Sequence, residues 1–435
     1  MHPADNAAPL ARPTAESTTF IVVALIVSLF FMWGVANNLN DILIKQFKKA
    51  FELSDFQAGL VQSAFYMGYF VLAIPASICM RRLGYKAALL VGLGLYAAGA
   101  FLFSPAAAGH SYGLFLIALF IIASGLAFLE TSANPLVTVL GPADRAAWRL
   151  NLAQSFNPLG SITGVLIGQH FIFSGIEHRP AELAAMTAAA RHAYYLSESA
   201  AVQVPYLVIG SVVVIWALLI AAIRFPAVAN HREDTHRGGS HARHLLHNSN
   251  FVLAVVAQFF YVGAQVGVWS FLIRYVQASL PGTPEKSAAN FLTLSLIVFM
   301  IGRFIGTALM RYLAPARLLA VFAVINIALV TIAVLAPGRV GTYALVVTSF
   351  FMSVMFPTIF ALGLRGLDDD DRKLGSSFLV MAIIGGALLT AAMGAVSDFA
   401  GIHHAMAVPV VSFAVVFAFA LKTNRVQRQG VPHMP

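Results

Sequence analysis

The chain has little charge and almost no cysteine. Only 10% of its 435 residues are Asp, Glu, Lys or Arg, whereas 59% are hydrophobic. Soluble domains carry about 25% charged residues, because a globule needs them to coat its surface. The scarcity argues against a cytosolic enzyme, a nucleic-acid-binding protein and a disordered chain. The single cysteine, Cys79, excludes an intramolecular disulfide and a CxxC metal site.

Long apolar runs are what the sequence has instead. A helix needs about 20 residues to cross the hydrocarbon core of a bilayer. Twelve runs of about this length are present, at 20–47, 55–80, 85–105, 112–140, 147–174, 203–224, 250–277, 288–311, 316–336, 341–365, 374–396 and 404–422. They do not alternate as barrel strands do, and lipid favours segments that satisfy their own backbone hydrogen bonds. We predict an all-α membrane protein with twelve transmembrane helices.

The twelve runs divide evenly around a polar, charged stretch. The basic turn at 80–86, after the second run, resembles the turn at 310–317, after the eighth. Two related six-helix halves are the plan of major facilitator transporters. The predicted organisation is a cytoplasmic tail at 1–19, a first half at 20–224, a cytoplasmic linker at 225–248, a second half at 249–422 and a cytoplasmic tail at 423–435.

The basic residues predict the orientation. With the amino terminus inside, 19 of the 27 Lys and Arg fall on inner loops and helix ends and 8 fall outside. Arg303 is counted here among the inner helix ends. Cytoplasmic loops are richer in Lys and Arg, so we expect both termini to be cytoplasmic.

Two acids lie well inside apolar runs, Asp41 in the first and Glu130 in the fourth. A charge at the bilayer centre costs about 3 kcal/mol on insertion scales, so such residues usually face a cavity and act on protons, ions or substrate. Asn38 precedes Asp41 by three residues and Asn134 follows Glu130 by four, so each pair shares a helix face. An alternative for Asp41 is an ion pair with Lys45 near the outer surface.

Two further runs carry polar or aromatic stripes at helical spacing. The predicted stripes contain Gln154 and Asn157 in the fifth run and Gln258, Tyr261, Gln265 and Trp269 in the seventh. Amides and acids bind hydroxyl groups, and an aromatic ring covers the C–H face of a sugar. These residues, with Asn38, Glu130 and Asn134, are therefore predicted to bind sugar. The alternatives are amides that only hold helices together, and an Asn134 that serves the carbonyls freed by Pro135.

Other motifs are absent or read as structural. There is no P-loop lysine motif, so ATP is not expected to drive the protein. We expect no cofactor and no bound metal, with the proton as coupling ion. The acidic run at 368–371 is expected to be a solvated cytoplasmic loop that pairs with Arg372 and Lys373.

Seven segments resemble the proton-coupled L-fucose permeases of the major facilitator superfamily. They are NNLNDIL at 37–43, FQAGL at 56–60, LETSANP at 129–135, RLNLAQSFN at 149–157, AQFFYVGAQ at 257–265, WSFLIRY at 269–275 and PTIF at 357–360. The resemblance runs from about residue 20 to 420. It implies twelve helices, proton symport and alternating access.

The resemblance also implies residue roles. Asp41 matches the family's proton-coupling aspartate, and Glu130 matches a glutamate tied to sugar recognition and coupling. Asn38, Gln154 and Asn157 match sugar-contacting amides. Lys45 stands where the fucose permeases have proline, and Met355–Phe356 stand where they have Gln-Tyr, which is expected to alter the sugar site.

The combined prediction is a monomeric sugar:proton symporter of a bacterial inner membrane, with L-fucose the leading substrate. Its partners are expected to be a small sugar and membrane lipid, and no nucleic acid. Symport of glucose, galactose or N-acetylglucosamine is the nearest alternative. More distant alternatives are a proton-coupled exporter of organic cations, a membrane-bound enzyme and a sugar sensor.

Overall fold

The computed structural model describes residues 15–53, 55–172, 180–225 and 238–429. For Asn38, Asp41 and Lys45 the structure describes the helical backbone but not the side chains. Two of the predicted site residues, Asn38 and Asp41, are therefore placed by backbone only.

Helices account for every predicted apolar run. The first half contains α1 (Ala15–Ala50), α2 (Asp55–Leu83), α3 (Tyr85–Ala108), α4 (Tyr112–Val139), α5 (Ala146–Gln154), α6 (Asn157–Ile167), α7 (Pro180–Ala185), α8 (Ala188–Ala200) and α9 (Gln203–Ala222). The second half contains α11 (Ser249–Ser279), α12 (Glu285–Leu309), α13 (Pro315–Leu335), α14 (Arg339–Met352), α15 (Met355–Gly363), α16 (Asp369–Met381), α17 (Gly385–Ala400), α18 (Ile402–Ala405) and α19 (Ala407–Gln429). Within the described ranges there is no strand.

Some runs form broken helices. The fifth run is split between α5 and α6, and the tenth between α14 and α15. In each case a proline, Pro158 or Pro357, lies in the first turn of the second piece, where its missing N–H costs no helical bond. In the described part, ten helices are long and apolar enough to cross a membrane, and α1 adds a shorter apolar segment at Val22–Asn37.

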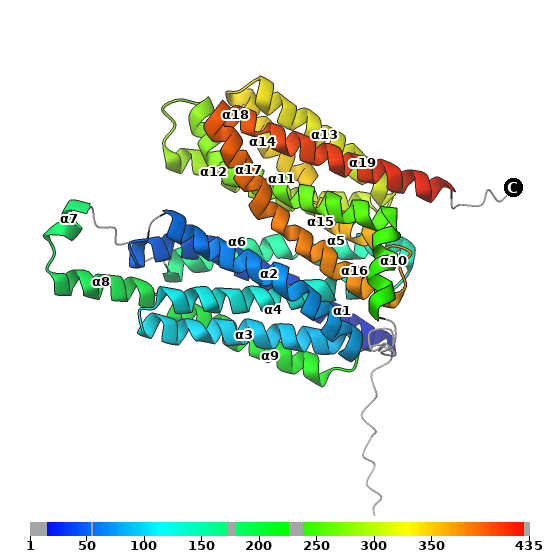
Figure 1. Cartoon of the computed structure of the whole chain (residues 1–435), viewed down its shortest axis with the longest axis horizontal. Helices are drawn as coiled ribbons and strands as arrows, with labels where there is room; N and C mark the ends of the chain where they lie inside the picture. Colours follow the sequence, from blue (N-terminus) through cyan, green and yellow to red (C-terminus); the bar gives the residue numbers. More distant parts are fainter. Residues whose placement is uncertain (1–14, 54, 173–179, 226–237, 430–435) are drawn as a thin grey trace, which may run out of the picture.

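The helices form two bundles that lie side by side (Figure 1). In the first bundle α1 packs against α6, and α4 lies between α2 and α3. In the second bundle α11 packs against α17 and α19, and α13 against α14 and α19. The predicted linker contains one described helix, α10 (Gly238–His247), which packs against α11 and α16. The end of the molecule at which α10 lies is called the α10 end below.

The two bundles are joined at the α10 end. There α16 packs against α2 and α4, and α15 packs against α5. Ser376 Oγ of α16 donates to the Thr131 carbonyl of α4 at 2.9 Å. Asn151 Nδ2 of α5 donates to Thr358 Oγ1 of α15 at 3.1 Å. These contacts close the interface between the halves at this end.

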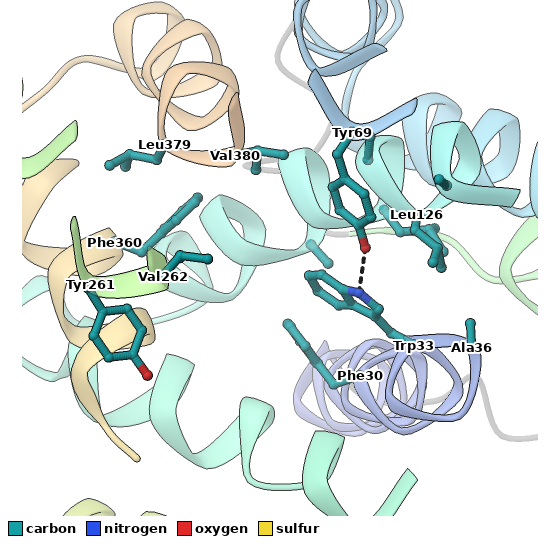
Figure 2. Packing of buried hydrophobic residues seen from close by; sticks show 14 of the residues in the cluster. Phe30, Trp33, Ala36, Tyr69, Leu126, Tyr261, Val262, Phe360, Leu379 and Val380 are labelled. Carbon is teal, nitrogen blue, oxygen red and sulfur yellow. Dashed lines mark hydrogen bonds between the residues drawn. The ribbon is translucent and has the colours of Figure 1, made fainter. Parts of the chain in front are cut away.

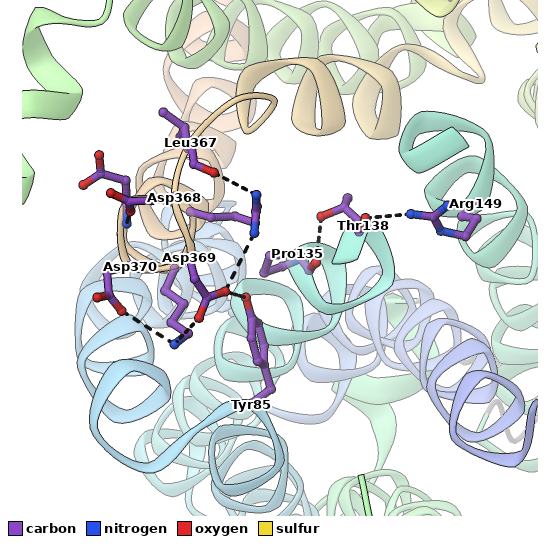
Figure 3. A network of polar contacts seen from close by, with 11 residues as sticks. Tyr85, Pro135, Thr138, Arg149, Leu367, Asp368, Asp369 and Asp370 are labelled. Carbon is purple, nitrogen blue, oxygen red and sulfur yellow. Dashed lines mark hydrogen bonds and ion pairs between the residues drawn. The ribbon is translucent and has the colours of Figure 1, made fainter. Parts of the chain in front are cut away.

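The acidic run at 368–371 belongs to a network of polar contacts at this closed end (Figure 3) and is less solvated than the sequence indicated. Lys373 Nζ lies 2.6 Å from Asp369 Oδ2, which is the expected pairing, but the Lys373 side chain is fully buried. Its ammonium lies over the Tyr85 ring, 5.6 Å from the centroid. The Asp371 side chain is buried as well and contacts His244 of α10. Because α16 packs on the other half, its first turn is only partly in water: the Asp369 and Asp370 side chains are 27% and 24% exposed.

Close contact between α1 and α6 fixes one predicted site residue. A Cβ on Gly160 would lie 1.9 Å from the Phe31 carbonyl oxygen, and one on Gly34 would lie 2.0 Å from that of Asn157. Only glycine allows the two backbones to approach this closely. The approach places Asn157 beside α1, where its Nδ2 donates to the Phe30 carbonyl at 3.2 Å.

Candidate functional site

A cavity of about 670 Å³ lies between the two halves. Its first wall comes from α1, α2, α4, α5 and α6, and its second wall from α11, α12, α15 and the turn at Ala382–Ile384. The lining follows α6 from Asn157 to Leu166, away from the α10 end. The cavity therefore extends toward the end of the molecule opposite the closed one.

Glu130 is the acid that the described side chains bring to this cavity. It is 2% exposed, and its Oε2 atom has no hydrogen-bond partner among the described residues. A buried carboxylate with an unsatisfied oxygen is costly, so the group must be protonated, hydrated or bound by a ligand. This arrangement is typical of a group that exchanges protons or binds hydroxyls.

Three amides accompany Glu130. Gln154 and Asn157 line the cavity, while Asn134 lies behind Gln154 and accepts from its Nε2 at 3.0 Å. The Asn134 Nδ2 atom makes no hydrogen bond within the described part of the chain. The amide therefore does not serve the carbonyls freed by Pro135, and it orients Gln154 instead.

Gln265 and Trp269 of α11 line the second wall. Trp269 Nε1 donates to Ser349 Oγ at 3.0 Å, and the Trp269 ring meets Phe299 edge to face with centroids 5.0 Å apart. Both contacts hold the indole in one orientation while it borders the cavity. It can present an aromatic face to a ligand there.

Gln258 and Tyr261 are not brought to the cavity. The Tyr261 hydroxyl donates to the Met352 carbonyl at 2.9 Å, and both side chains are fully buried. In Figure 2 Tyr261 lies apart from the Trp33–Tyr69 pair of the first wall. The cavity ends along α11 at the level of Val262, and the Tyr261 hydroxyl contacts the last residue of α14 instead.

The sequence reasoning missed several lining residues of the first wall. Trp33 Nε1 donates to the Tyr69 hydroxyl at 2.7 Å (Figure 2). Gln62 and Tyr66 precede Tyr69 on α2, and Asn37 borders the cavity from α1. Spacings of four and three residues place the α2 side chains on one helix face, so the sequence carries the same polar-stripe signal here as at Gln154 and Asn157.

Arg303 is the most consequential omission. The charge pattern predicts a basic helix end at this residue, but the side chain is 4% exposed and lines the cavity. Its Nη1 donates across the interface to the Gln154 carbonyl at 3.2 Å and to Gln154 Oε1 at 3.4 Å. The sequence did contain a signal, because Arg303 is the single Lys or Arg between residues 287 and 310.

Two other expectations concern residues near the cavity. Phe356 lines it, so one of the three positions that depart from the fucose permeases lies at the site. Asp41 and Asn38 belong to α1, but their side chains lie outside the described part. Among the described residues, no group of His, Cys, Asp and Glu is arranged to hold a metal ion.

The chain belongs to the Major Facilitator Superfamily, and within it to the fucose permease family: the superfamily model matches residues 21–383. The L-fucose-proton symporter of Escherichia coli is 49% identical over 415 residues, which cover 94% of each chain. The glucose/galactose transporter of Brucella abortus is 36% identical, over 95% of this chain and 97% of its own.

Solved structures agree with this assignment. The crystal structure of the transporter FucP in the outward conformation is 49% identical, covers 93% of this chain and 99% of its own, and superposes with a TM-score of 0.87.

Proposed function

We propose that this protein imports a hexose-type sugar, with L-fucose the leading substrate, by proton symport through alternating access. Two relatives named as L-fucose-proton symporters, each of which matches 94% of this chain, support the proposal. The observation that carries it is a cavity that combines one buried carboxyl with an unpartnered oxygen, five amide side chains and a fixed indole. Sugar hydroxyls both donate and accept hydrogen bonds, so they match this set.

The coupling of sugar transport to proton transport follows from the free-energy cost of burying a charge while the site, closed to water, changes the side it faces. A neutral carboxyl is buried more cheaply than a carboxylate. Protonation of Glu130 from the open side would therefore lower the barrier to reorientation, and release on the other side would return the site to its charged form. Asp41, which follows Asn37 by about one turn on α1, is the proposed second proton carrier.

We also propose that the α10 end faces the cytoplasm of a bacterial inner membrane. The loops and helix ends at that end hold most of the Lys and Arg, and such a bias marks the cytoplasmic side. Both termini and the linker would then be cytoplasmic. The cavity described above would face outward, ready to receive sugar and proton.

The nature of the second wall bears on the substrate. Arg303 places a positive charge in the cavity, and this charge repels organic cations, so a cation exporter is disfavoured. Phe356 lines the cavity but lacks the phenolic hydroxyl of the tyrosine that the fucose permeases have at this position. Glucose and galactose, the substrates named for the Brucella abortus relative, are therefore the closest competitors of L-fucose.

The test is radiolabelled sugar uptake into proteoliposomes with an imposed pH gradient, acid outside. We expect L-fucose to accumulate above its external concentration, and a protonophore to abolish the accumulation. A panel of L-fucose, D-glucose, D-galactose and N-acetylglucosamine ranks the substrates. Accumulation that persists without a pH gradient or membrane potential would contradict proton symport.

A further inference from the structure

Arg303 occupies an unusual place for a basic residue. It lies in the apolar helix α12, six residues before the last one, and is buried beside the cavity. An ammonium or guanidinium group in the membrane interior usually faces a substrate or ion pathway. Among the side chains that the structure describes, Arg303 has no carboxylate partner within ion-pair distance.

The contacts of Arg303 leave hydrogen-bonding capacity unused. A guanidinium carries five N–H donors. The described contacts employ Nη1, toward Gln154, and the Phe299 ring, whose centroid lies 5.0 Å from the guanidinium carbon. The buried Nε atom has no hydrogen-bond partner within the described part. A buried donor without an acceptor is costly, so a ligand oxygen at this position would be strongly favoured.

Glu130 shows the complementary deficit on the opposite wall. Its Oε2 is a buried acceptor without a donor among the described residues, whereas the Nε of Arg303 is a buried donor without an acceptor there. Both residues line the same cavity. A hydroxyl group can satisfy either one, because it donates to a carboxylate and accepts from a guanidinium. A molecule with several hydroxyls can satisfy both at once and leave the charge of the site unchanged.

We propose that Arg303 is a sugar-specificity residue, which donates from the second wall to one hydroxyl, or to two adjacent hydroxyls, of a neutral sugar held by the first wall. The inference rests on the function proposed above. Because Arg303 also bonds to Gln154, and Gln154 to Asn134, a sugar at this position contacts both halves through one connected set of hydrogen bonds.

Two rival roles give different results. In the first, Arg303 only joins the halves through the Gln154 carbonyl, and its loss weakens every ligand alike. In the second, Arg303 binds an anion, and a sugar carboxylate binds better than the neutral sugar. The proposed role requires instead that the effect of the substitution depends on one particular hydroxyl.

The experiment measures ligand dissociation constants by calorimetry on the purified full-length protein. The ligands are L-fucose, the analogues that each lack one ring hydroxyl, and L-galacturonate as the carboxylate probe. The variants are Arg303→Gln and Arg303→Lys, which keeps the charge but loses the planar fork and Nε. Arg311→Gln is the matched control, because Arg311 lies shortly after α12, over the Trp148 ring at 5.3 Å, and does not line the cavity.

We expect Arg303→Gln and Arg303→Lys to weaken L-fucose binding by at least about 10-fold, as expected for a lost hydrogen bond from a charged group. One deoxy analogue, or two that lack adjacent hydroxyls, should bind the wild type and both variants with similar affinity. The Arg311→Gln variant should retain wild-type constants for all ligands. If one Arg303 variant fails to fold, the other still completes the comparison.

Parallel weakening of every analogue would overturn the proposal in favour of a purely structural role. Tighter binding of L-galacturonate than of L-fucose by the wild type would overturn it in favour of an anion site. A wild type that binds none of the neutral sugars would instead contradict the proposed function itself, which separates the two failures.

Discussion

The two walls of the cavity differ in chemistry. The first wall presents a carboxyl, amides and phenol groups, among them Glu130, Gln154, Asn157, Tyr66 and Tyr69. The second wall is mainly aliphatic and aromatic, with Val262, Leu292, Leu296, Ile297 and Phe299 among its residues, and Arg303 as its charged member.

The difference indicates a division of roles between two halves of related architecture. The first half holds the group that can exchange a proton together with the amides that can read hydroxyls. The second half covers the ligand with an apolar surface and contributes a fixed charge at one point. Substitutions in the two walls should therefore differ in kind. Three predictions test this comparison, and a fourth concerns α10, outside both walls.

The largest effect is expected for Glu130→Gln. The amide resembles the neutral carboxyl but cannot titrate, so gradient-driven accumulation should be lost while sugar counterflow at equal pH continues. If Glu130 carries the coupled proton, linkage requires that the sugar affinity of the variant becomes nearly independent of pH. Radiolabelled uptake and counterflow in proteoliposomes measure both.

The matched control is Glu182→Gln, because Glu182 lies exposed on α7 and does not line the cavity. It should accumulate sugar as the wild type does. Full accumulation by Glu130→Gln would move the coupling role to Asp41.

Next in size is the contrast between polar and apolar positions. Gln154→Ala and Asn157→Ala should each weaken sugar binding by about 1–3 kcal/mol, the cost of leaving a buried polar partner unpaired. Leu296→Ala on the second wall should change the binding free energy by about 0.5 kcal/mol or less, as at positions without specific contacts. Binding is measured by calorimetry. Equal losses of sugar-binding free energy for substitutions in the two walls would contradict the proposed division of roles between the halves.

A smaller effect is expected for the aromatic residue of the second wall. Trp269→Phe should weaken sugar binding by about 1 kcal/mol, since a ring remains but the larger indole and its bond to Ser349 are lost. Trp216→Phe provides the control, because Trp216 bonds to Ser28 away from the cavity. Unchanged affinity in Trp269→Phe would reassign the indole to packing.

The smallest expected effect is on thermal stability, and it concerns α10, away from both walls. A hydrogen bond with the buried Asp371 carboxylate raises the pKa of the exposed His244 imidazole above its ordinary value. A raised folded-state pKa stabilises the protein below the unfolded value of 6.5, and this contribution is lost as pH rises through the folded value.

His244→Gln should therefore lower the melting temperature slightly below pH 6.5 and leave it unchanged at high pH. Thermal unfolding of the purified variant and wild type across this range measures the difference. A constant difference at all pH values would show that protonation of His244 is not involved.

The sequence predicted the helices and the halves well, because lipid leaves the backbone few choices and the apolar runs record each crossing. It also identified Glu130, since an acid in the middle of such a run is rarely tolerated unless it faces a cavity. The depth of each side chain was harder to predict. Arg303 lies eight residues before the next basic residue, Arg311. Its assignment to a helix end therefore placed it too near the membrane surface, and its burial was not predicted.

The stripe on α11 shows a second limit. Gln258, Tyr261, Gln265 and Trp269 follow helical spacing, but only the last two line the cavity. Spacing predicts a shared direction around the helix axis and not a shared position along it. The neighbours that cover Tyr261, at Met352 of α14, are nearly a hundred residues away in sequence, and no local pattern reports them.

The glycine contact between α1 and α6 has a mechanical consequence. The equivalent contact recurs in the second half, where a Cβ on Gly385 of α17 would lie 2.1 Å from the Phe259 carbonyl of α11. Backbones in such contact resist sliding past each other, so each helix pair is expected to move as one rigid unit. The movement needed for a transport cycle is then expected at the hydrogen-bonded interface where α15 and α16 meet the first half. A substitution that makes this interface more rigid should slow the cycle and leave the cavity unchanged.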